Sequence, residues 1–596
     1  MTPEIYYSER LQQLQKKLFS LLEKKSHLGV WRFLAAVVLI AAIYFLWSYN
    51  LGLIIIVSII LFAVFIKLIF ADNDNNYAIQ HTRHLIKINE DEQRALQHDY
   101  YHFADGKEFM QENHMYANDL DIFGRASLFQ YINRTTSEPG SSLFAQWLLN
   151  ASEVETISER QNAIKEIAQK TEWQQELQAI GKEKKIQTNT KERLQAWLLE
   201  PNSFLKFKPW NWLRYLLPGI ICFAVALYIF DRIQLPVLIY FLMAFVVIAY
   251  IINKKVSPIH EQLSKMVDEL DVLSASIKLL EKTSFTSPLL IKMQQLLISQ
   301  NNSASGELKS IKNILERLDL RYNLVLAAPL NILLLWSLQQ VISLEKWKDK
   351  NKGHVIGWFD MLGYFEALNS FGILSFNHPE WSFPLLKDKH FFIDGKQVGH
   401  PLINKNKRVD NNIKIERSGE LMLVTGSNMA GKSTYLRCIG INIVLAMAGA
   451  PVCADYFILS PVKMISSMRI ADNLEESTST FYAELKKLKT IIEQVNKEEK
   501  IFILLDEILR GTNSLDRHTG SVALLKQLIK HNGVGIIATH DVELAKLKDT
   551  YPENILNYHF DAEITNDELY FDYLLKPGIC TSLNASVLMK KIGIDL

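Results

Sequence analysis

Two long runs without a charged side chain constrain this chain more than any other feature of its sequence. The first run covers residues 33–66, with the polar turn Ser48-Tyr49-Asn50 near its middle. A helix needs roughly 20 apolar residues to cross the hydrocarbon core of a bilayer, so this run predicts two short transmembrane helices. A signal peptide is a poor alternative because the run is too long and lacks a small-residue cleavage pattern.

The second run repeats this pattern, because residues 215–230 and 235–252 are apolar and 231–234 form a polar turn between them. Basic residues flank both runs on their outer sides, whereas the turns carry only Asp231 and Arg232. The positive-inside rule then places every soluble segment in the cytoplasm, in a multi-pass protein of the inner or cell membrane. The alternative interpretation, buried helical hairpins in a soluble core, would demand an unusually large surrounding protein.

The sequence between and after these runs indicates helices. Residues 71–210 and 254–345 are rich in Leu, Gln, Glu, Lys and Ala, and apolar residues recur there at three- and four-residue spacing. This pattern predicts a helical scaffold or lever without catalytic residues. The chain is too long for one hydrophobic core. We predict an N-terminal cytoplasmic helix, a membrane hairpin, a helical core, a second membrane hairpin, a helical lever and an ATPase domain, with the bounds 1–30, 31–70, 71–210, 211–253, 254–345 and 346–596.

A phosphate-binding loop is the strongest chemical motif in the chain. The apolar segment 421–425 predicts a strand, G-x-x-x-x-G-K-S follows, and residues 435–448 predict a helix. Glycines let such a loop wrap closely round phosphate, whose charge faces the backbone N–H groups and the helix N-terminus. Lys432 is predicted to reach the terminal phosphates and Ser433 to bind Mg²⁺. The predicted nucleotide-binding residues of the loop are Gly426, Ser427, Asn428, Met429, Ala430, Gly431, Lys432, Ser433 and Thr434.

Acidic residues and a histidine complete the predicted site. The apolar strand 501–505 ends in Asp506 and Glu507. Asp506 is predicted to support Mg²⁺, and Glu507 to orient or deprotonate the attacking water. The next apolar strand ends before His540, which is placed to sense the terminal phosphate. The sequence therefore predicts ATP and Mg²⁺ as cofactors, with Glu507, Lys432 and His540 as catalytic residues and Ser433 and Asp506 as metal ligands.

These motifs resemble those of the MutS DNA mismatch-repair family. Residues 425–434, TGSNMAGKST, are similar to the family's P-loop, with Ser427 where proline is usual. Residues 479–484, STFYAE, resemble the family's S-T-F-x-x-E segment. Residues 506–514, DEILRGTNS, look like its D-E-x-x-R-G-T-x-S run, and Ala538-Thr539-His540 matches its A-T-H switch. Weaker similarity upstream, at 119–134 and 398–402, extends to the family's helical core and its G-x-H-P segment.

The resemblance implies a fold and partners. The expected fold is multidomain, with helical transmembrane hairpins, an all-α core and lever, and a C-terminal α/β P-loop NTPase of the ABC-like kind. It also implies a homodimer with composite sites, in which Ser479 acts in trans on the partner's nucleotide, and it implies DNA as a partner. Arg408 stands where the family has an adenine-stacking aromatic, and its guanidinium can stack on a base.

Departures from the family pattern leave the role of DNA open. The chain has no Phe-x-Glu mismatch reader, and the second apolar run lies near where the family's DNA clamp would be inserted. The net charge is +1, from 65 basic and 64 acidic side chains, so composition does not predict a nucleic-acid partner. The four cysteines form no Cys-x-x-Cys pair, which argues against zinc and against a disulfide framework.

Two functions therefore follow as hypotheses. In the first, a homodimeric, membrane-anchored ATPase couples hydrolysis to movement of its helical core on DNA, in mismatch repair or DNA-structure sensing. In the second, the ATPase acts on its own four transmembrane helices or on a membrane partner, without DNA. A transporter is disfavoured because the spans offer little polar lining and no Leu-Ser-Gly-Gly-Gln segment occurs. The salt dependence of DNA affinity would distinguish the two hypotheses.

Overall fold

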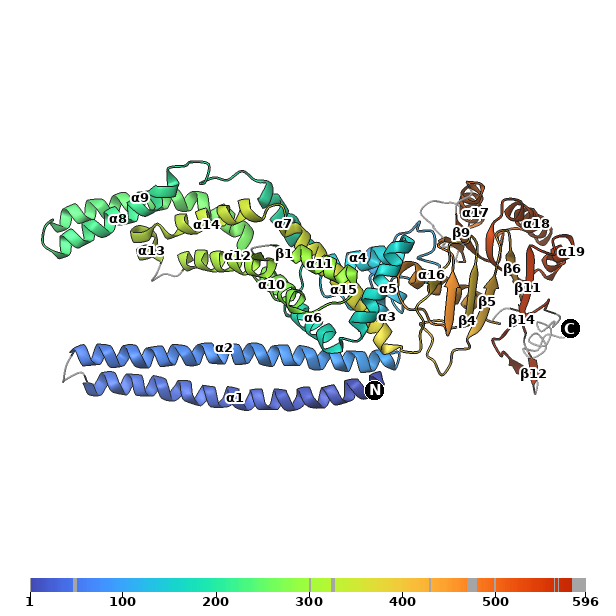
Figure 1. The fold of residues 1–596 in the computed structure, drawn as a ribbon, viewed down its shortest axis with the longest axis horizontal. Coiled ribbons are helices and arrows are strands. Elements are labelled where there is room, and N and C mark those ends of the chain that lie inside the picture. The colour runs from blue at the N-terminus through green and yellow to red at the C-terminus, as the bar shows by residue number, and fades with distance from the viewer. Residues whose placement is uncertain are drawn as a thin grey trace.

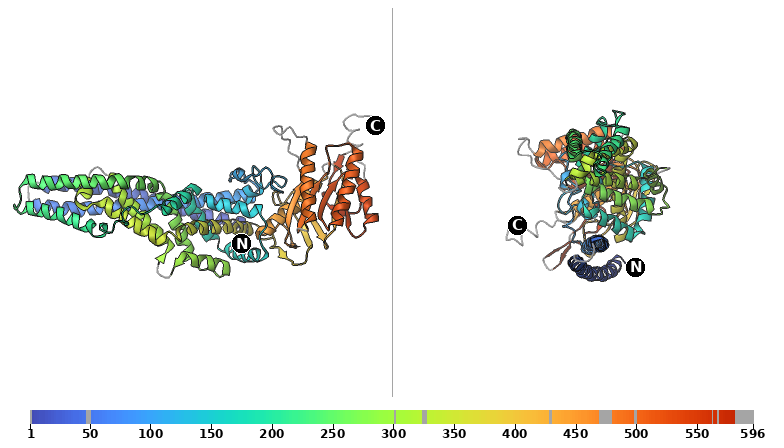
Figure 2. Two further views of the ribbon diagram at one scale, coloured as in Figure 1. Left: turned by 90° about the horizontal axis from the view of Figure 1, so that it is seen from above. Right: turned by 90° about the vertical axis from the view of Figure 1, so that its left-hand side faces the viewer.

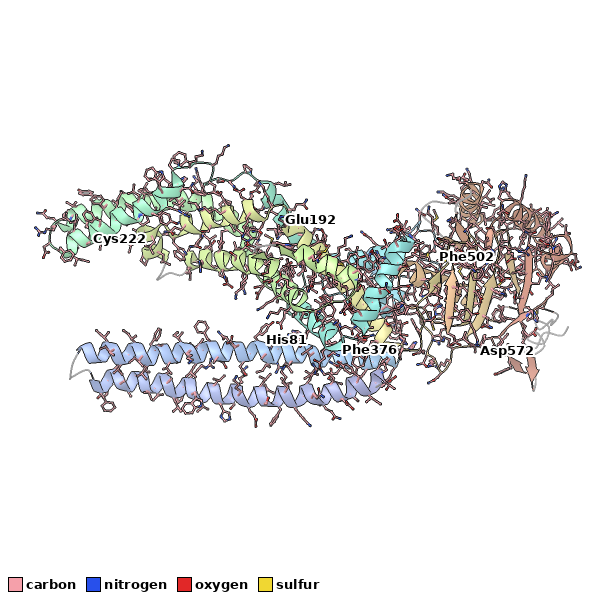
Figure 3. All side chains as sticks on the ribbon, viewed as in Figure 1. His81, Glu192, Cys222, Phe376, Phe502 and Asp572 are labelled. Atoms are coloured by element: carbon pink, nitrogen blue, oxygen red, sulfur yellow. The ribbon has the colours of Figure 1, made fainter. Side chains whose placement is uncertain are left out.

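The computed structural model describes residues 2–46, 51–299, 302–322, 327–427, 430–468, 480–497, 500–561, 563–565 and 568–580. The molecule is elongated, with a sheet-containing domain at one end and two helical hairpins that extend toward the other (Figure 1). Cys222 in one hairpin and Phe502 in the sheet mark these opposite ends in Figure 3. The sequence-predicted order of apolar helices, a mostly helical core and a C-terminal α/β domain is confirmed.

The first hairpin consists of α1 (Pro3–Leu46) and α2 (Leu51–Leu96). At 1.5 Å per residue, the 44 residues of α1 extend for about 66 Å. An ion pair of 2.9 Å between Arg32 and Asp72 joins the two helices where their apolar part begins. Below it, the base of the hairpin packs on α6 (Thr171–Glu183) through the small core cluster Leu14, Leu85, Ile88 and Ala179. The polar base and the apolar tip are thus one continuous pair of helices.

The second hairpin consists of α8 (Trp210–Ile229) and α9 (Leu235–Ser264). It points in the same direction as the first, and the two hairpins lie on different sides of the molecule when it is viewed end-on (Figure 2). Among the described residues, four helices are long and apolar enough to cross a membrane, namely the two of each hairpin. Most of the side chains in their apolar windows are exposed. Placement in a membrane and its sidedness stay predictions.

Helices also make up the region between the hairpins and the sheet domain. Those after the first hairpin are η1 (Lys107–Phe109), α3 (Leu128–Ile132), α4 (Glu138–Leu149), α5 (Val154–Ala168), α6 and α7 (Thr188–Leu199). Those after the second are α10 (Val267–Lys282), α11 (Pro288–Leu297), α12 (Ala304–Asp319), η2 (Leu320–Tyr322), α13 (Ala327–Leu334), α14 (Trp336–Asn351) and α15 (Val355–Asn377). The short strands β1 (Ile298–Ser299) and β2 (Asn302–Ser303) pair between α11 and α12. Helix α15 packs on α4 and α5 and leads into the sheet domain.

The C-terminal domain contains a six-stranded sheet in the order β14-β11-β6-β10-β9-β8. All neighbouring pairs are parallel except β11 and β14. The strands β6, β9 and β10 are entirely buried, which explains why their sequences are continuous apolar runs. The strand bounds are β6 (Leu421–Thr425), β8 (Lys463–Ser467), β9 (Ile501–Asp506), β10 (Val534–Thr539), β11 (Ile555–Phe560) and β14 (Leu575–Pro577).

A smaller four-stranded sheet has the order β3-β7-β4-β5, and a short hairpin is formed by β12 (Glu563–Thr565) and β13 (Glu568–Tyr570). The strands of the smaller sheet are β3 (Leu385–Leu386), β4 (Ile393–Val398), β5 (Asn411–Ile415) and β7 (Tyr456–Leu459). The helices of the domain are α16 (Lys432–Ala448), α17 (Thr480–Asn496), α18 (Ser514–Lys530), η3 (Val542–Lys546) and α19 (Leu547–Thr550). In the large sheet β10 lies between β6 and β9, so the loops after these parallel strands meet at one edge.

Candidate active site

The loop between β6 and α16 depends on two glycines. Gly426 has φ +150° and Gly431 has φ +103°, values that side-chain-bearing residues rarely adopt. A Cβ at Gly426 would lie 2.9 Å from the carbonyl oxygen of Phe560, so the strand β11 passes too close for any side chain. The predicted loop residues Asn428 and Met429 lie outside the described residues. Ser427 and Ala430 flank them, and Thr434 lies in the first turn of α16.

Lys432 places a cation at the start of α16. Its Nζ donates hydrogen bonds to the carbonyl oxygens of Gly426, at 2.8 Å, and Ser427, at 2.9 Å. Burial lowers the pKa of Lys432 to about 8. The first N–H groups of an α-helix have no partner within the helix, and the positive end of its dipole lies there as well. The ammonium and the helix N-terminus together favour an anion at this point.

Ser433 and Asp506 meet at the same edge of the sheet. The Oγ of Ser433 donates a hydrogen bond of 2.5 Å to Oδ2 of Asp506, which is buried at the end of β9. Hydroxyl and carboxylate oxygens are the ligands that Mg²⁺ prefers in proteins. The donor set of this pair therefore fits the predicted metal ion.

Glu507 is held from both sides. His540 contacts Oε1 of Glu507 through Nε2, and Arg510 contacts Oε2 through Nε at 3.1 Å. The opposite ring nitrogen of His540, Nδ1, lies 2.8 Å from the carbonyl oxygen of Gly426, so His540 bridges the loop and the acidic pair. The hydrogen bond from His540 lowers the pKa of Glu507. Glu507 is consequently ionised at neutral pH and able to accept a proton.

The backbone after Asp506 is strained. Glu507 has φ +52° and Leu509 has φ +59°, and such left-handed conformations cost on the order of 1–3 kcal/mol each for residues other than glycine. The buried carboxylate of Glu484 in α17 accepts the N–H groups of Leu509 and, at 3.2 Å, Arg510. Glu484 therefore positions the loop that carries Glu507. The sequence alone did not predict this role, although Glu484 is the last residue of the S-T-F-x-x-E segment. The first residue of that segment, Ser479, lies outside the described residues.

A cavity of about 450 Å³ adjoins the loop. Its lining contains the first residues of α16 and Glu507 on one side and the segment between β4 and β5 on the other. Arg408 lies in this lining, with its side chain 8% exposed, and is paired to Asp410 at 2.6 Å. The structure thus brings Arg408 into one cavity with the phosphate-binding loop. The residues that line the cavity are Val398, His400, Ile403, Lys407, Arg408, Val409, Asn411, Ser427, Gly431, Lys432, Ser433, Thr434, Tyr435, Cys438, Glu507, Phe560 and Tyr573.

Tyr573 and His400 are further lining residues to which sequence analysis assigned no role. A Cβ on Gly431 would lie 3.1 Å from the ring of Tyr573, so this ring covers the loop. The carbonyl oxygen of Tyr573 accepts a hydrogen bond of 3.0 Å from Asn411. Burial lowers the pKa of His400 to about 4, so the ring is neutral at physiological pH. His400 belongs to the G-x-H-P segment, which could have indicated it, but no motif marks Tyr573.

The site therefore combines a cationic loop, a hydroxyl–carboxylate pair and an ionised glutamate around one cavity. Transfer of a phosphoryl group to water requires charge stabilisation at the phosphate and a group that orients or deprotonates the nucleophile. Each of these requirements has a matching residue here. The cavity extends beyond the loop toward apolar and cationic side chains, where the remainder of a nucleotide could be held.

Known proteins share this domain. The family model for MutS domain V matches residues 422–590. The DNA mismatch repair protein MutS of Ehrlichia chaffeensis is 33% identical over 228 residues, which are 38% of this chain and 27% of the relative. The same protein of Bacillus subtilis is 33% identical over 224 residues, 36% of this chain and 25% of the relative. MutS protein homolog 4 of Homo sapiens is 31% identical over 199 residues, 32% of this chain and 21% of the relative. The chain thus spans only a minor part of the length of these curated relatives.

Proposed function

We propose that this chain is a membrane-anchored ATPase of the MutS family, because residues 422–590 match the family model for MutS domain V. The observation that supports this proposal best is that Lys432, Ser433 and Glu507 line a single cavity. Asp506 is joined to it by its hydrogen bond with Ser433. The proposed site uses residues 426–434 for the phosphates and the pair Asp506 and Glu507 for metal and water. Asn428 and Met429, which lie outside the described residues, belong to this proposal through the sequence motif.

Each residue of the proposed site has a role that follows from its position. Ser433 and Asp506 would hold Mg²⁺, which supplies charge neutralisation at the phosphates when it is bound. Lys432 donates to two carbonyl oxygens, which are weaker acceptors than an anion because they are neutral. Its ammonium would therefore exchange these two partners for phosphate oxygens when ATP binds. Glu507 accepts the proton of the attacking water, while His540 and Arg510 fix the orientation of its carboxylate.

We further propose that the active form is a homodimer that binds DNA. The names of the relatives support DNA as a partner, and the S-T-F-x-x-E segment supports a composite site in which Ser479 reaches the partner's nucleotide. Arg408 would support the base, because its fixed guanidinium plane lines the same cavity.

The test is the ATPase activity of the detergent-solubilised protein with duplex, mismatched, branched and no DNA. DNA binding coupled to hydrolysis should change the ATPase rate, and DNA affinity should fall steeply with salt because phosphate contacts release counterions. An unchanged rate with every DNA, together with a flat salt response, would rule out the DNA part of this proposal. ATP hydrolysis without DNA would still support the ATPase.

A second function, ATP-driven action on the membrane, is favoured by a buried link between the site and the helical core. Arg160 in α5 donates a hydrogen bond of 3.1 Å to the carbonyl oxygen of Ala448, at the C-terminus of α16. The same guanidinium stacks 3.7 Å from the ring centroid of Trp147 in α4. Helix α15 packs on α4 and α5, and α14, which directly precedes α15 in the chain, packs on α9. Through these contacts, movement of α16 would reach the candidate membrane helix α9. Stimulation of hydrolysis by lipid vesicles but not by DNA would favour this function.

The affinity for ATP should fall as the pH rises through about 8, the pKa of Lys432. Below this pH the amine of Lys432 is charged and attracts the triphosphate. Above it the amine loses its charge, and the affinity for ATP should then fall by up to about tenfold for each further pH unit. The terminal phosphate, whose second pKa is about 6, is already ionised over this range. Binding of a fluorescent ATP analogue with Mg²⁺, measured across this range, tests the prediction.

The matched control for this titration is Lys432→Arg, because arginine keeps its charge at every pH used. Its affinity should be nearly constant over the range in which the natural protein weakens. If Lys432→Arg weakens with the same midpoint, the titrating group is not Lys432.

A further inference from the structure

A third uncharged run lies outside the two hairpins. Residues 322–344 carry no charged side chain, although Arg321 and Glu345 bound them on either side. The described residues of the run, 322 and 327–344, do not form a spanning helix. Helix α13 has only eight residues, and Leu335, with φ +47°, separates it from α14. An apolar stretch that is too short to span is typical of a buried helix or of a re-entrant or interfacial membrane segment.

The position of the run favours a re-entrant or interfacial membrane segment over a buried helix. Helix α13 packs against both α8 and α9, the candidate membrane helices of the second hairpin. Arg321, just before the run, donates a hydrogen bond of 2.7 Å to Ser257 in α9. Ser257 follows Lys254 and Lys255, which end the apolar part of α9. The run therefore starts at the level where the candidate span ends.

At the start of α14, the chain also returns to the level at which the candidate span of α9 ends. Trp336, the first residue of α14, donates its indole N–H to the carbonyl oxygen of Arg317 at 2.7 Å. Arg317 lies in α12, on the other side of the excursion. The start of α14 is thus joined to α12, so α13 lies between two points on the same side of the helical core. This is the course of a re-entrant segment, not of a span.

Several polar groups at the break between α13 and α14 have partners within the protein. Oδ1 of Asn331 accepts hydrogen bonds from the backbone N–H of Ser337, at 3.1 Å, and from its hydroxyl, at 2.8 Å. Non-helical backbone is tolerated at membrane depth only where its polar groups find partners within the protein. Leu334 meanwhile exposes 37% of its surface, and the neighbouring hairpin exposes Tyr250 and Val247. Exposed apolar side chains thus occur both next to the break after α13 and on the candidate span against which α13 packs.

We propose that α13 is a re-entrant helix seated among the acyl chains of the leaflet nearest the soluble domains. The proposal rests on the proposed membrane anchoring, because the occupant of its exposed face is lipid. It adds a fifth membrane element to the four candidate spans. Since α14 follows α13 directly and packs on α9, the lever is held at the membrane surface at this point.

Photo-crosslinking to lipid tests this placement. p-Benzoylphenylalanine replaces Leu334, or Leu333 as a second position, and the full chain is reconstituted in phosphatidylethanolamine and phosphatidylglycerol vesicles. Tyr240, which is 73% exposed in α9, is the control for the candidate span. Leu515, which is 74% exposed in α18, is the control for the soluble domain. Variants that retain the ATPase activity of the natural protein are irradiated, and lipid adducts are measured by mass spectrometry.

The adduct yield at Leu334 should match that at Tyr240 and exceed that at Leu515 several-fold, because a probe among acyl chains contacts lipid throughout the irradiation and a probe in water does not. Adducts at Tyr240 but at neither Leu334 nor Leu333 would overturn the re-entrant helix and leave the anchoring intact. Crosslinks from Leu334 to a second copy of the chain would also overturn it, because protein would then cover this face. Absence of adducts at Tyr240 would contradict the anchoring itself.

Discussion

Substitution of Glu507 by glutamine is expected to lower the rate of ATP hydrolysis by about 10²–10⁴-fold, the usual contribution of a general base. Glutamine keeps the volume of the side chain but cannot take a proton from water. ATP binding should persist, because Lys432, Ser433 and Asp506 are unchanged. The variant should therefore accumulate bound ATP, and its dissociation constant should stay close to that of the natural protein.

The measurement compares single-turnover hydrolysis of radiolabelled ATP with equilibrium retention of the same nucleotide. Glu543→Gln is the matched control, because Glu543 is an exposed carboxylate in η3 that pairs only with the exposed Lys546 in the described residues. This control should hydrolyse ATP at the natural rate. Normal hydrolysis by Glu507→Gln would remove Glu507 from the proposed mechanism.

Several residues that the sequence predicted for the site lie close together in the structure, for a physical reason, and their roles stay predictions. A loop that binds phosphate and a strand that ends in carboxylates have narrow chemical requirements, so few sequences satisfy them by chance. Parallel strands that are buried on both faces also have uninterrupted apolar sequences, and such sequences predicted the positions of β6, β9 and β10. Residues at the ends of such strands meet at one edge, as Lys432, Asp506 and His540 do.

The contacts of the positioning residues could not be predicted in this way, even where a motif contains the residue, as the S-T-F-x-x-E segment contains Glu484. Glu484 acts on the backbone of Leu509 and Arg510, and any buried glutamate could serve this purpose from several places. Tyr573 reaches the loop only because β14 returns beside β11 at the edge of the sheet. Both roles depend on tertiary contacts between segments far apart in the chain, and local sequence patterns carry no record of such contacts.

The helix bounds near the hairpins differ from the predicted segment bounds for another reason. Helix α1 continues through the predicted boundary after residue 30, α2 through that after 70, and α9 through that after 253. Composition changes at these points because the predicted solvent changes from water to lipid. The backbone bonds of a helix do not depend on that change, and no proline interrupts these junctions. Composition therefore predicts a membrane boundary but not the end of a helix.

Replacement of Lys432 by alanine should impair both binding and hydrolysis, in contrast to the change at Glu507. Loss of one partner from a desolvated, hydrogen-bonded charge pair costs about 2–5 kcal/mol, which corresponds to roughly 30-fold to several-thousand-fold weaker ATP binding. The fold should persist, because Lys432 bonds only to the carbonyl oxygens of its own loop and to His540 in the described residues. Retention of labelled ATP with Mg²⁺ measures the affinity, and thermal unfolding without nucleotide measures the stability.

Lys546→Ala is the matched control for this variant, since Lys546 is 65% exposed and lies outside the cavity. Its affinity for ATP should equal that of the natural protein. The two principal variants then separate the two halves of the site: Glu507→Gln binds without turnover, and Lys432→Ala loses both. If Lys432→Ala retained ATP as tightly as Lys546→Ala, the triphosphate would not lie against the loop at 426–434. The proposed ATPase site would then be wrong, whatever the hairpins do in the membrane.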